Sequence, residues 1–327
     1  MKKILIINIL VTILLIFFLE LLINFLGLAQ LGGVEAKKLY DLTSENFKYK
    51  ANATGLVFNK IVYTEKNGLR APNPNYEYKE NNESIIFFGD SVTFGNGVDE
   101  PNSFVGLLRN KFKELNFYNV STPGNQIDNH YKNLIYLEKI KNIKKIFYIF
   151  TLNDIDINTN TEQIYVSKKN ENFIEKIRNI KLINYINSSL RNKSYLYIYL
   201  KGIFTDPSAR WFKYDYNLYK KVDLIKNLER FLENFNNLVL TKGQELIVVI
   251  LPYEYQTRKN NCKGENLMPQ NQLAKILKDK NIKFYDLVPL FCSQDKKKDL
   301  FYKFDPMHLS ERGHNLIFKF LSNEVFN

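Results

Sequence analysis

Hydrophobic residues from position 84 to the C-terminus form short apolar runs that alternate with stretches of helical spacing. The apolar runs predict strands buried on both faces, at 84–88, 117–122, 144–154, 244–254 and 282–289. The stretches between them predict helices at 104–115, 128–140 and 214–240, and Ser310 is a suitable N-cap for a last helix. Strands alternating with helices indicate an α/β fold with a doubly wound parallel sheet of five strands.

The N-terminal 30 residues have a different pattern, because residues 4–31 are largely apolar, with Asn8, Glu20 and Asn24 among the few polar positions. About 25 residues at 1.5 Å each exceed the roughly 30 Å thickness of the hydrocarbon layer. Lys2 and Lys3 precede the span and favour a cytoplasmic N-terminus. We therefore expect an uncleaved single-pass anchor in the inner membrane, with the bulk of the chain on the periplasmic or extracytoplasmic side. A cleaved signal peptide is the alternative.

Two further segments complete the predicted organisation. Residues 31–83 contain β-branched and aromatic residues broken by Gly and Pro, and we expect an irregular or β-rich lead-in. Residues 84–327 form the main domain, with an insertion at about 157–214, since the third and fourth strands are too far apart for a simple crossover. Part of this insertion is basic, aromatic and amphipathic, which is typical of a helical cap, a packed helical subdomain or a membrane-facing element. Glu20 lies within the predicted anchor, where a charged side chain is costly. It therefore marks a contact with another helix, or it lies at a depth in the membrane where its charge is tolerated.

Charge and cysteine content narrow the class of protein. The net charge is +12, from 46 basic and 34 acidic residues, but the lysines are scattered and no nucleic-acid-binding pattern accompanies them. We therefore expect no nucleic-acid partner. The two cysteines, Cys262 and Cys292, form no CxxC motif, so no metal site is indicated. In an oxidising compartment they would form one disulfide, and two free thiols are the alternative.

Polar residues with catalytic chemistry follow the ends of several predicted strands. Ser91 follows the first strand and Gly124 the second, Asn153 lies at the C-terminal end of the third, and Asp305 and His308 come in a loop after the fifth. The carboxyl ends of parallel strands meet at one edge of the sheet. We predict acyl transfer there, with Ser91 as nucleophile, His308 as its base and Asp305 orienting the imidazole. The N–H groups of Ser91 and Gly124 and the Asn153 amide would form the oxyanion hole.

Competing interpretations of these residues are weaker. Ser91 in an ordinary turn would leave the other residues unexplained, and a phosphate-binding loop would need a GxxxxGK[ST] or GxGxxG pattern, which is absent. His130 and His314 lack an Asp three positions earlier, and we expect both to be structural. Asp154 is also expected to have a structural role.

Four blocks in this order resemble the SGNH, or GDSL-type, hydrolases. They are Gly89-Asp90-Ser91, Gly124 in NVSTPGNQID, Asn153 in TLND, and Asp305-Pro306-Met307-His308. The resemblance covers about residues 84–325, and NGLRAPNP before the sheet looks like a membrane-anchored, exported bacterial subgroup. It implies the flavodoxin-like sheet of this family, esterase, lipase, deacetylase or glycan O-acetyltransferase activity, and no metal or organic cofactor.

The chain departs from the family pattern at two positions. Thr151 stands where the third block usually begins with Gly, and its side chain would narrow the pocket or add a hydrogen bond. Pro123 precedes Gly124 and restricts that loop. Both departures bear on the substrate, and neither removes a catalytic atom.

The leading hypothesis is a serine esterase or O-acyltransferase that acts on acyl esters of a cell-surface glycan. The alternatives are a lipid esterase, whose acyl pocket the insertion would line, and a non-catalytic scaffold that binds glycan in polysaccharide assembly. The sequence leaves open the acyl donor and acceptor, the choice between hydrolysis and transfer, and the oligomeric state.

Overall fold

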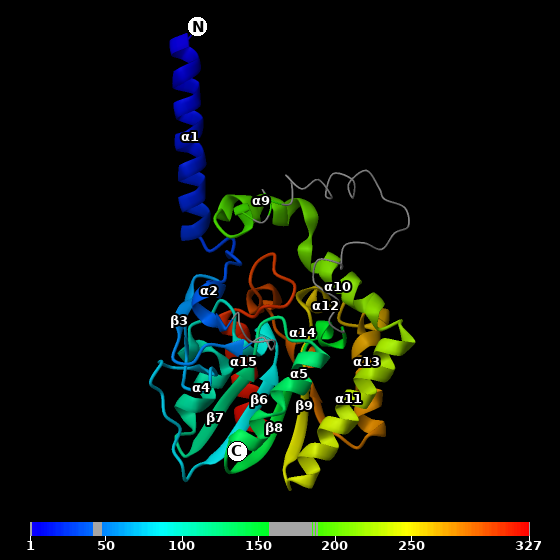
Figure 1. Ribbon diagram of the computed structural model, residues 1–327. Coiled ribbons are helices and arrows are strands. Elements are labelled where there is room, and N and C mark those ends of the chain that lie inside the picture. The colour runs from blue at the N-terminus through cyan, green and yellow to red at the C-terminus, as the bar shows by residue number, and fades with distance from the viewer. Residues whose placement is uncertain (1, 42–47, 157–184, 186, 188, 327) are drawn as a thin grey trace.

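The chain folds around a parallel sheet made of the five predicted strands. The computed structural model describes residues 2–41, 48–156, 185, 187 and 189–326 (Figure 1). The five strands are β6 (Glu83–Gly89), β7 (Leu115–Ser121), β8 (Ile143–Phe150), β9 (Glu245–Ile250) and β10 (Lys283–Asp286). They lie in the order β7-β6-β8-β9-β10, and every neighbouring pair is parallel. This doubly wound, flavodoxin-like order confirms the predicted fold class.

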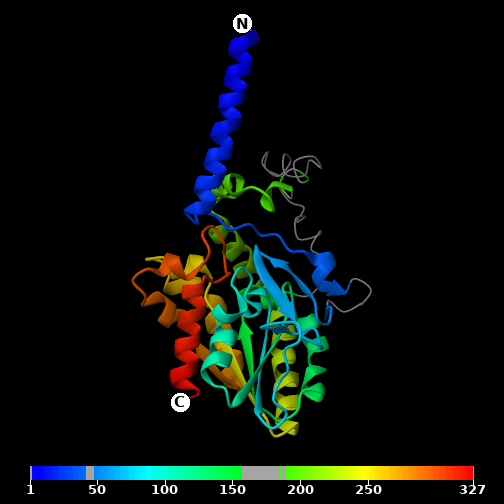
Figure 2. The same ribbon diagram turned by 90° about the vertical axis from the view of Figure 1, so that its left-hand side faces the viewer.

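Helices cover both faces of the sheet (Figures 1 and 2). One face carries α4 (Phe104–Lys111) and α15 (Glu311–Glu324), and the other carries α5 (Ile127–Asn133) and α11 (Val222–Thr241). Adjacent residues of β6 point to opposite layers: the Phe87 ring lies 5.5 Å from Phe104, and the Phe88 ring lies 5.3 Å from Phe235. Burial on both faces is why this strand reads as an unbroken apolar run.

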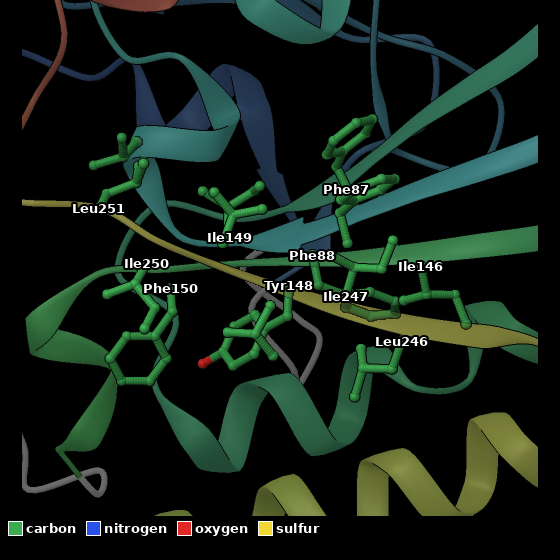
Figure 3. Packing of buried hydrophobic residues seen from close by; sticks show 14 of the residues in the cluster. Phe87, Phe88, Ile146, Tyr148, Ile149, Phe150, Leu246, Ile247, Ile250 and Leu251 are labelled. Carbon is green, nitrogen blue, oxygen red and sulfur yellow. The ribbon is translucent and has the colours of Figure 1, made fainter. Parts of the chain in front are cut away.

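The buried side chains between the layers form one continuous core (Figure 3). Phe87, Phe147 and Tyr148 from the central strands are fully buried, and Phe87 stacks on Phe147 with the ring centroids 4.9 Å apart. Burial of each such side chain stabilises the fold by about 1.5–3 kcal/mol. The sheet is therefore held rigidly at its centre.

Two predicted helices are interrupted in the structure. The predicted helix at 128–140 is divided into α5 and α6 (Tyr136–Lys139), and the one at 214–240 into α10 (Pro207–Leu218) and α11. At the second break, Tyr219 is buried and its hydroxyl donates to the Leu152 carbonyl at 3.1 Å. Because a buried hydroxyl needs a partner, this contact fixes the turn between α10 and α11. The spacing of the apolar residues did not predict this turn.

The remaining elements are short, apart from α9 and α13. They are α2 (Ala36–Leu39), α3 (Ser91–Phe94), α9 (Tyr195–Thr205), α12 (Glu254–Thr257), α13 (Met268–Asp279), α14 (Val288–Cys292) and the 3₁₀ turns Glu100–Asn102, Leu152–Ile155, Gly264–Leu267 and Lys297–Leu300. Most of the predicted insertion, 157–184, lies outside the described residues. The predicted last helix begins as expected, since Ser310 Oγ accepts from the Gly313 N–H at the start of α15.

The lead-in contains five short strands within its described residues, and part of it joins the main sheet. It contributes β1 (Tyr40–Asp41), β2 (Lys48–Tyr49), β3 (Thr54–Val57), β4 (Lys60–Thr64) and β5 (Arg70–Ala71). Strand β5 pairs antiparallel with β7, and β4 and β3 follow it, so the sheet has eight strands instead of five. The sequence did not indicate this, because a two-residue strand has no measurable periodicity.

The N-terminal helix α1 (Lys2–Phe25) extends away from the body of the protein (Figures 1 and 2). It is long and apolar enough to cross a membrane, and the most apolar part of it is not buried against the rest of the chain. A membrane anchor and a signal sequence both have these properties.

The two cysteines form the disulfide that the sequence left open. Cys262 and Cys292 are bonded with their Cα atoms 6.1 Å apart. The bond joins the segment after α12 to the end of α14 and closes a loop of 30 residues. It stabilises the fold mainly by restricting the unfolded state.

A buried arginine connects the lead-in to the segment after Ser91. Arg70 of β5 is 1% exposed and donates to the carbonyls of Phe94, Gly95 and Val98, at 2.7 Å for Gly95 and 2.6 Å for Val98. Burial lowers the pKa of Arg70 to about 10, which leaves it charged at neutral pH. One buried side chain thus donates to three backbone carbonyls of one loop.

We predict that Arg70→Met lowers the free energy of unfolding by about 3–5 kcal/mol, because it removes a buried donor to the carbonyls of Phe94 and Val98 and leaves the Gly95 carbonyl with the Val98 N–H alone. Urea unfolding of the full chain in detergent would measure the change. Arg312→Met is the matched control, since Arg312 is 43% exposed and its loss should change stability by less than about 0.5 kcal/mol. Equal stability of the two variants would contradict the role given to Arg70.

Candidate active site

Ser91 lies at the carboxyl end of β6, where the backbone turns into the short helix α3. Gly89 is required at this turn, because a Cβ on it would lie 2.0 Å from Thr93 Oγ1. Asp90 Oδ1 accepts from the Val92 N–H at 2.8 Å and so caps α3. Ser91 is the first residue of α3, and its own N–H therefore has no intrahelical acceptor.

Ser91, His308 and Asp305 form a continuous hydrogen-bonded chain. The Ser91 Oγ lies 2.8 Å from His308 Nε2, and His308 Nδ1 lies 2.8 Å from Asp305 Oδ2. The second carboxylate oxygen, Asp305 Oδ1, accepts from the N–H groups of Met307 at 3.0 Å and His308 at 2.8 Å. Nδ1 therefore donates to Asp305, which leaves Nε2 to accept the Ser91 proton.

The surroundings of Asp305 and His308 shift their pKa values in opposite directions. Burial by itself would lower the pKa of His308, but the adjacent Asp305 carboxylate outweighs it and raises that pKa above its usual value. Burial would likewise raise the pKa of Asp305, but the charge of His308 and the hydrogen bonds to the carboxylate lower it. Asp305 is thus ionised, and the imidazole is a stronger base than an isolated one.

The loop that carries Asp305 and His308 is held by three hydrogen bonds to other segments. Ser208 Oγ of α10 donates to the Asp305 carbonyl at 3.1 Å. The Glu254 N–H of α12 donates to the Pro306 carbonyl at 2.9 Å. The Tyr302 hydroxyl donates to the Gly97 carbonyl in the segment after α3. These bonds fix where the imidazole lies relative to the serine.

Asp90 links the turn after β6 to the end of β8. Its Oδ2 accepts from Thr151 Oγ1 at 3.0 Å and from Asn153 Nδ2 at 3.1 Å. Thr151, the departure from the family pattern, thus adds a hydrogen bond, which is one of the two outcomes expected for it. Asn153 uses one of its two amide hydrogens in this contact.

The orientation of the Asn153 amide also depends on two residues that were not predicted from the sequence. The Tyr253 hydroxyl lies 3.2 Å from Asn153 Oδ1 and 2.5 Å from Asp215 Oδ2. Burial raises the pKa of Asp215 to about 7. Tyr253 lies at the C-terminal end of the fourth predicted strand, 244–254, and this position at the same edge of the sheet was the only signal for it in the sequence. Nothing in the sequence indicated Asp215.

Gly124 lies in the loop that follows β7, next to β6 in the sheet. Gly89 pairs with Ser121 in the parallel register, and the Thr122 N–H lies 3.4 Å from the Gly89 carbonyl. The φ of Gly124 is +82°, which a residue with a Cβ rarely adopts. The loop therefore leaves the same edge of the sheet as the Ser91 turn.

Phe58 of the lead-in contacts the imidazole and was also not predicted from the sequence. The Phe58 ring lies 5.0 Å from the ring of His308. Phe58 and Asn59 both have positive φ and connect β3 to β4 as a two-residue turn. Because Phe58 and Asn59 stand between two strand-like segments, the sequence could indicate a turn here. It could not indicate that this turn contacts His308.

The other two histidines and Asp154 have separate surroundings. His130 Nε2 lies 3.7 Å from Asp154 Oδ1, and burial raises the pKa of Asp154 to about 6. His314 Nδ1 accepts from the Phe104 N–H at 3.3 Å, and burial lowers the pKa of His314 to about 3. All three are buried, in keeping with the structural roles expected for them. Within the described part of the chain, no cluster of three or more His, Cys, Asp or Glu side chains is placed to hold a metal ion.

No family model and no curated protein matches the chain. Solved structures similar to it include a member of the lipolytic G-D-S-L family from Veillonella parvula, a lipase/acylhydrolase from Enterococcus faecalis and an acetyl xylan esterase. The first is 16% identical, with a TM-score of 0.41, over 75% of this chain and 99% of that one. The second is 15% identical, with a TM-score of 0.42, over 74% and 95%. The third is 17% identical, with a TM-score of 0.41, over 74% and 99%.

Proposed function

We propose that the protein is a serine esterase or O-acyltransferase that acts on ester-linked acyl groups of a cell-surface glycan. The observation that carries this proposal is the hydrogen-bonded chain from Ser91 through His308 to Asp305. A non-catalytic scaffold would have no need of this arrangement. The glycan is proposed from the resemblance to SGNH hydrolases and from the extracytoplasmic location that we propose.

In the first step, Ser91 Oγ attacks the ester carbonyl while His308 Nε2 takes its proton. Asp305 stabilises the imidazolium that forms. Collapse of the tetrahedral intermediate expels the alcohol, which takes the proton from His308, and leaves an acyl group on Ser91. Water or a sugar hydroxyl then attacks this acyl-enzyme with His308 again as base, which restores the serine.

The negative oxygen of the tetrahedral intermediate is proposed to bind the N–H groups of Ser91 and Gly124 and the other amide hydrogen of Asn153. One such donor typically contributes about 3–4 kcal/mol to stabilisation of the transition state. Asp90 and Tyr253 are positioning residues in this proposal, because they hold the Asn153 amide at both of its ends.

We further propose that α1 remains in the inner membrane and that the rest of the chain is extracytoplasmic. The disulfide between Cys262 and Cys292 supports this, since disulfides persist in oxidising compartments. Lys2 and Lys3 support the orientation.

A fluorophosphonate probe tests the nucleophile, because it reacts with serines activated by a neighbouring base. We expect the wild type to be labelled and Ser91→Ala to show no labelling. Ser293→Ala, which changes an exposed serine, is the control and should be labelled like the wild type. A folded wild type that fails to react would refute the assignment of Ser91.

The pH dependence of labelling tests the role of Asp305. His308 must be neutral to accept the proton, so the labelling rate should rise with pH through a midpoint above the usual histidine value of about 6.5. Asp305→Asn removes the charge that raises this pKa; the midpoint should move to lower pH, and the maximal rate should fall by roughly 10³–10⁴-fold. Asp299→Asn, at a 59% exposed carboxylate, should leave the profile unchanged. An unshifted midpoint in Asp305→Asn would contradict the proposed coupling.

Incubation with the acetylated surface polysaccharide of the host, followed by NMR of the acetate, tests the substrate. Release of free acetate would indicate an esterase, and acetate on a new hydroxyl would indicate a transferase; Ser91→Ala should produce neither. A protein that leaves the polysaccharide unchanged and cleaves only long-chain nitrophenyl esters would be the lipid esterase.

The contact of α9 with Phe304, next to Asp305, favours the lipid esterase as a second candidate, because it places apolar residues beside the site.

A further inference from the structure

Glu20, the single acidic residue of α1, caps the N-terminus of α9. Its carboxylate accepts from Ser194 Oγ at 2.9 Å and from the N–H groups of Tyr195 at 2.5 Å and Leu196 at 3.0 Å. A carboxylate at a helix N-terminus satisfies free N–H groups and interacts favourably with the helix dipole. The position of Glu20 along α1 therefore fixes the level along that helix at which α9 lies.

In the proposed anchor, Glu20 lies near the end of the span, at about the boundary between headgroups and acyl chains. Glu20 precedes Phe25, the last residue of α1, by about 7–8 Å of helix rise. Interfacial helices bury their apolar face about 5–10 Å into this boundary. In both views α9 crosses the foot of α1 instead of continuing its direction (Figures 1 and 2).

One face of α9 is apolar and exposed. Leu200, Ile203 and Phe204 are 45%, 52% and 80% exposed, and their spacing places them on one side of the helix. A different side contacts the body of the protein: a Cβ on Gly202 would lie 2.1 Å from Phe304, and the Tyr199 ring lies 5.8 Å from that of Phe304. The exposed face is thus not the one that holds α9 in place.

Tyrosines and basic residues also occur on and around α9. Tyrosines at 195, 197 and 199 are of the type enriched at membrane interfaces. Arg191, Lys193 and Lys303 are exposed around α9, and the Lys303 Nζ lies 5.1 Å from the Tyr199 ring. Basic residues at this level attract anionic lipid headgroups.

We propose that α9 is an interfacial helix, whose exposed apolar face is embedded in the same anionic bilayer that α1 spans. The inference rests on the proposed membrane anchor. It has a consequence for the site: Phe304, which contacts α9, directly precedes Asp305, so the candidate active site lies close to the membrane surface. Its ester substrate is then one presented at that surface.

Tryptophan quenching by brominated lipids tests this inference on the full chain. The protein is reconstituted in vesicles of three parts phosphatidylcholine to one part phosphatidylglycerol. Trp211, the only tryptophan, is replaced by phenylalanine, and single reporters are introduced as Phe204→Trp in α9, Phe17→Trp in α1 and Leu240→Trp at the end of α11. Fluorophosphonate labelling of each variant verifies that it is folded.

We expect Phe204→Trp to be quenched roughly twofold, more strongly by bromine near the headgroup than by bromine near the chain ends. Phe17→Trp should be quenched more strongly by the deep bromine. Leu240→Trp, on an equally apolar residue that is 57% exposed, should not be quenched.

Two outcomes would overturn the inference, and they are distinguishable. If Phe17→Trp is quenched and Phe204→Trp behaves like Leu240→Trp, α1 is an anchor but α9 is not interfacial. If Phe17→Trp is also unquenched, the anchor and the inference fail together. In either case retained probe labelling would leave the proposed esterase chemistry standing.

Discussion

The candidate site exists because β6 pairs in a fixed register with β7 on one side and β8 on the other. Phe87 and Phe88 are buried in opposite layers, so a slip of one residue would exchange their environments throughout the strand. With the register held, Gly89 lies beside Ser121, and the loops after β6 and β7 leave the sheet together. The turn that carries Ser91 and the loop that carries Gly124 therefore start from the same edge of the sheet.

Carboxylates organise the rim that this pairing creates. Asp90 accepts three hydrogen bonds and ties the turn after β6 to the end of β8. Asp305 accepts three and aligns His308. Asp215, which contacts Tyr253, has its pKa raised to about 7 by burial, whereas the pKa of Asp305 is lowered. The two pKa values shift in opposite directions because burial dominates at Asp215, whereas at Asp305 burial is outweighed by the charge of His308 and the hydrogen bonds.

The segment before the sheet reaches the same rim by two routes. Gln30 Nε2 donates to the Phe58 carbonyl at 2.5 Å, and the Phe58 ring packs on His308. Glu20 caps α9, and α9 packs on Phe304 beside Asp305. The lead-in, residues 31–83, is therefore in contact with the main domain across the predicted boundary. In addition, β5 pairs with β7, and Arg70 supports the loop after Ser91.

Local patterns in the chain were enough to predict the α/β class, the five parallel strands and the serine, histidine and aspartate that meet at their edge. Strands buried on both faces must be apolar throughout, and residues with acyl-transfer chemistry follow the strand ends. Four features became visible only in the folded chain: the lead-in joins the sheet, Tyr253 and Asp215 orient Asn153, Phe58 covers His308, and Glu20 caps α9. Each of these contacts joins residues far apart in the chain, and no local periodicity records such a pairing.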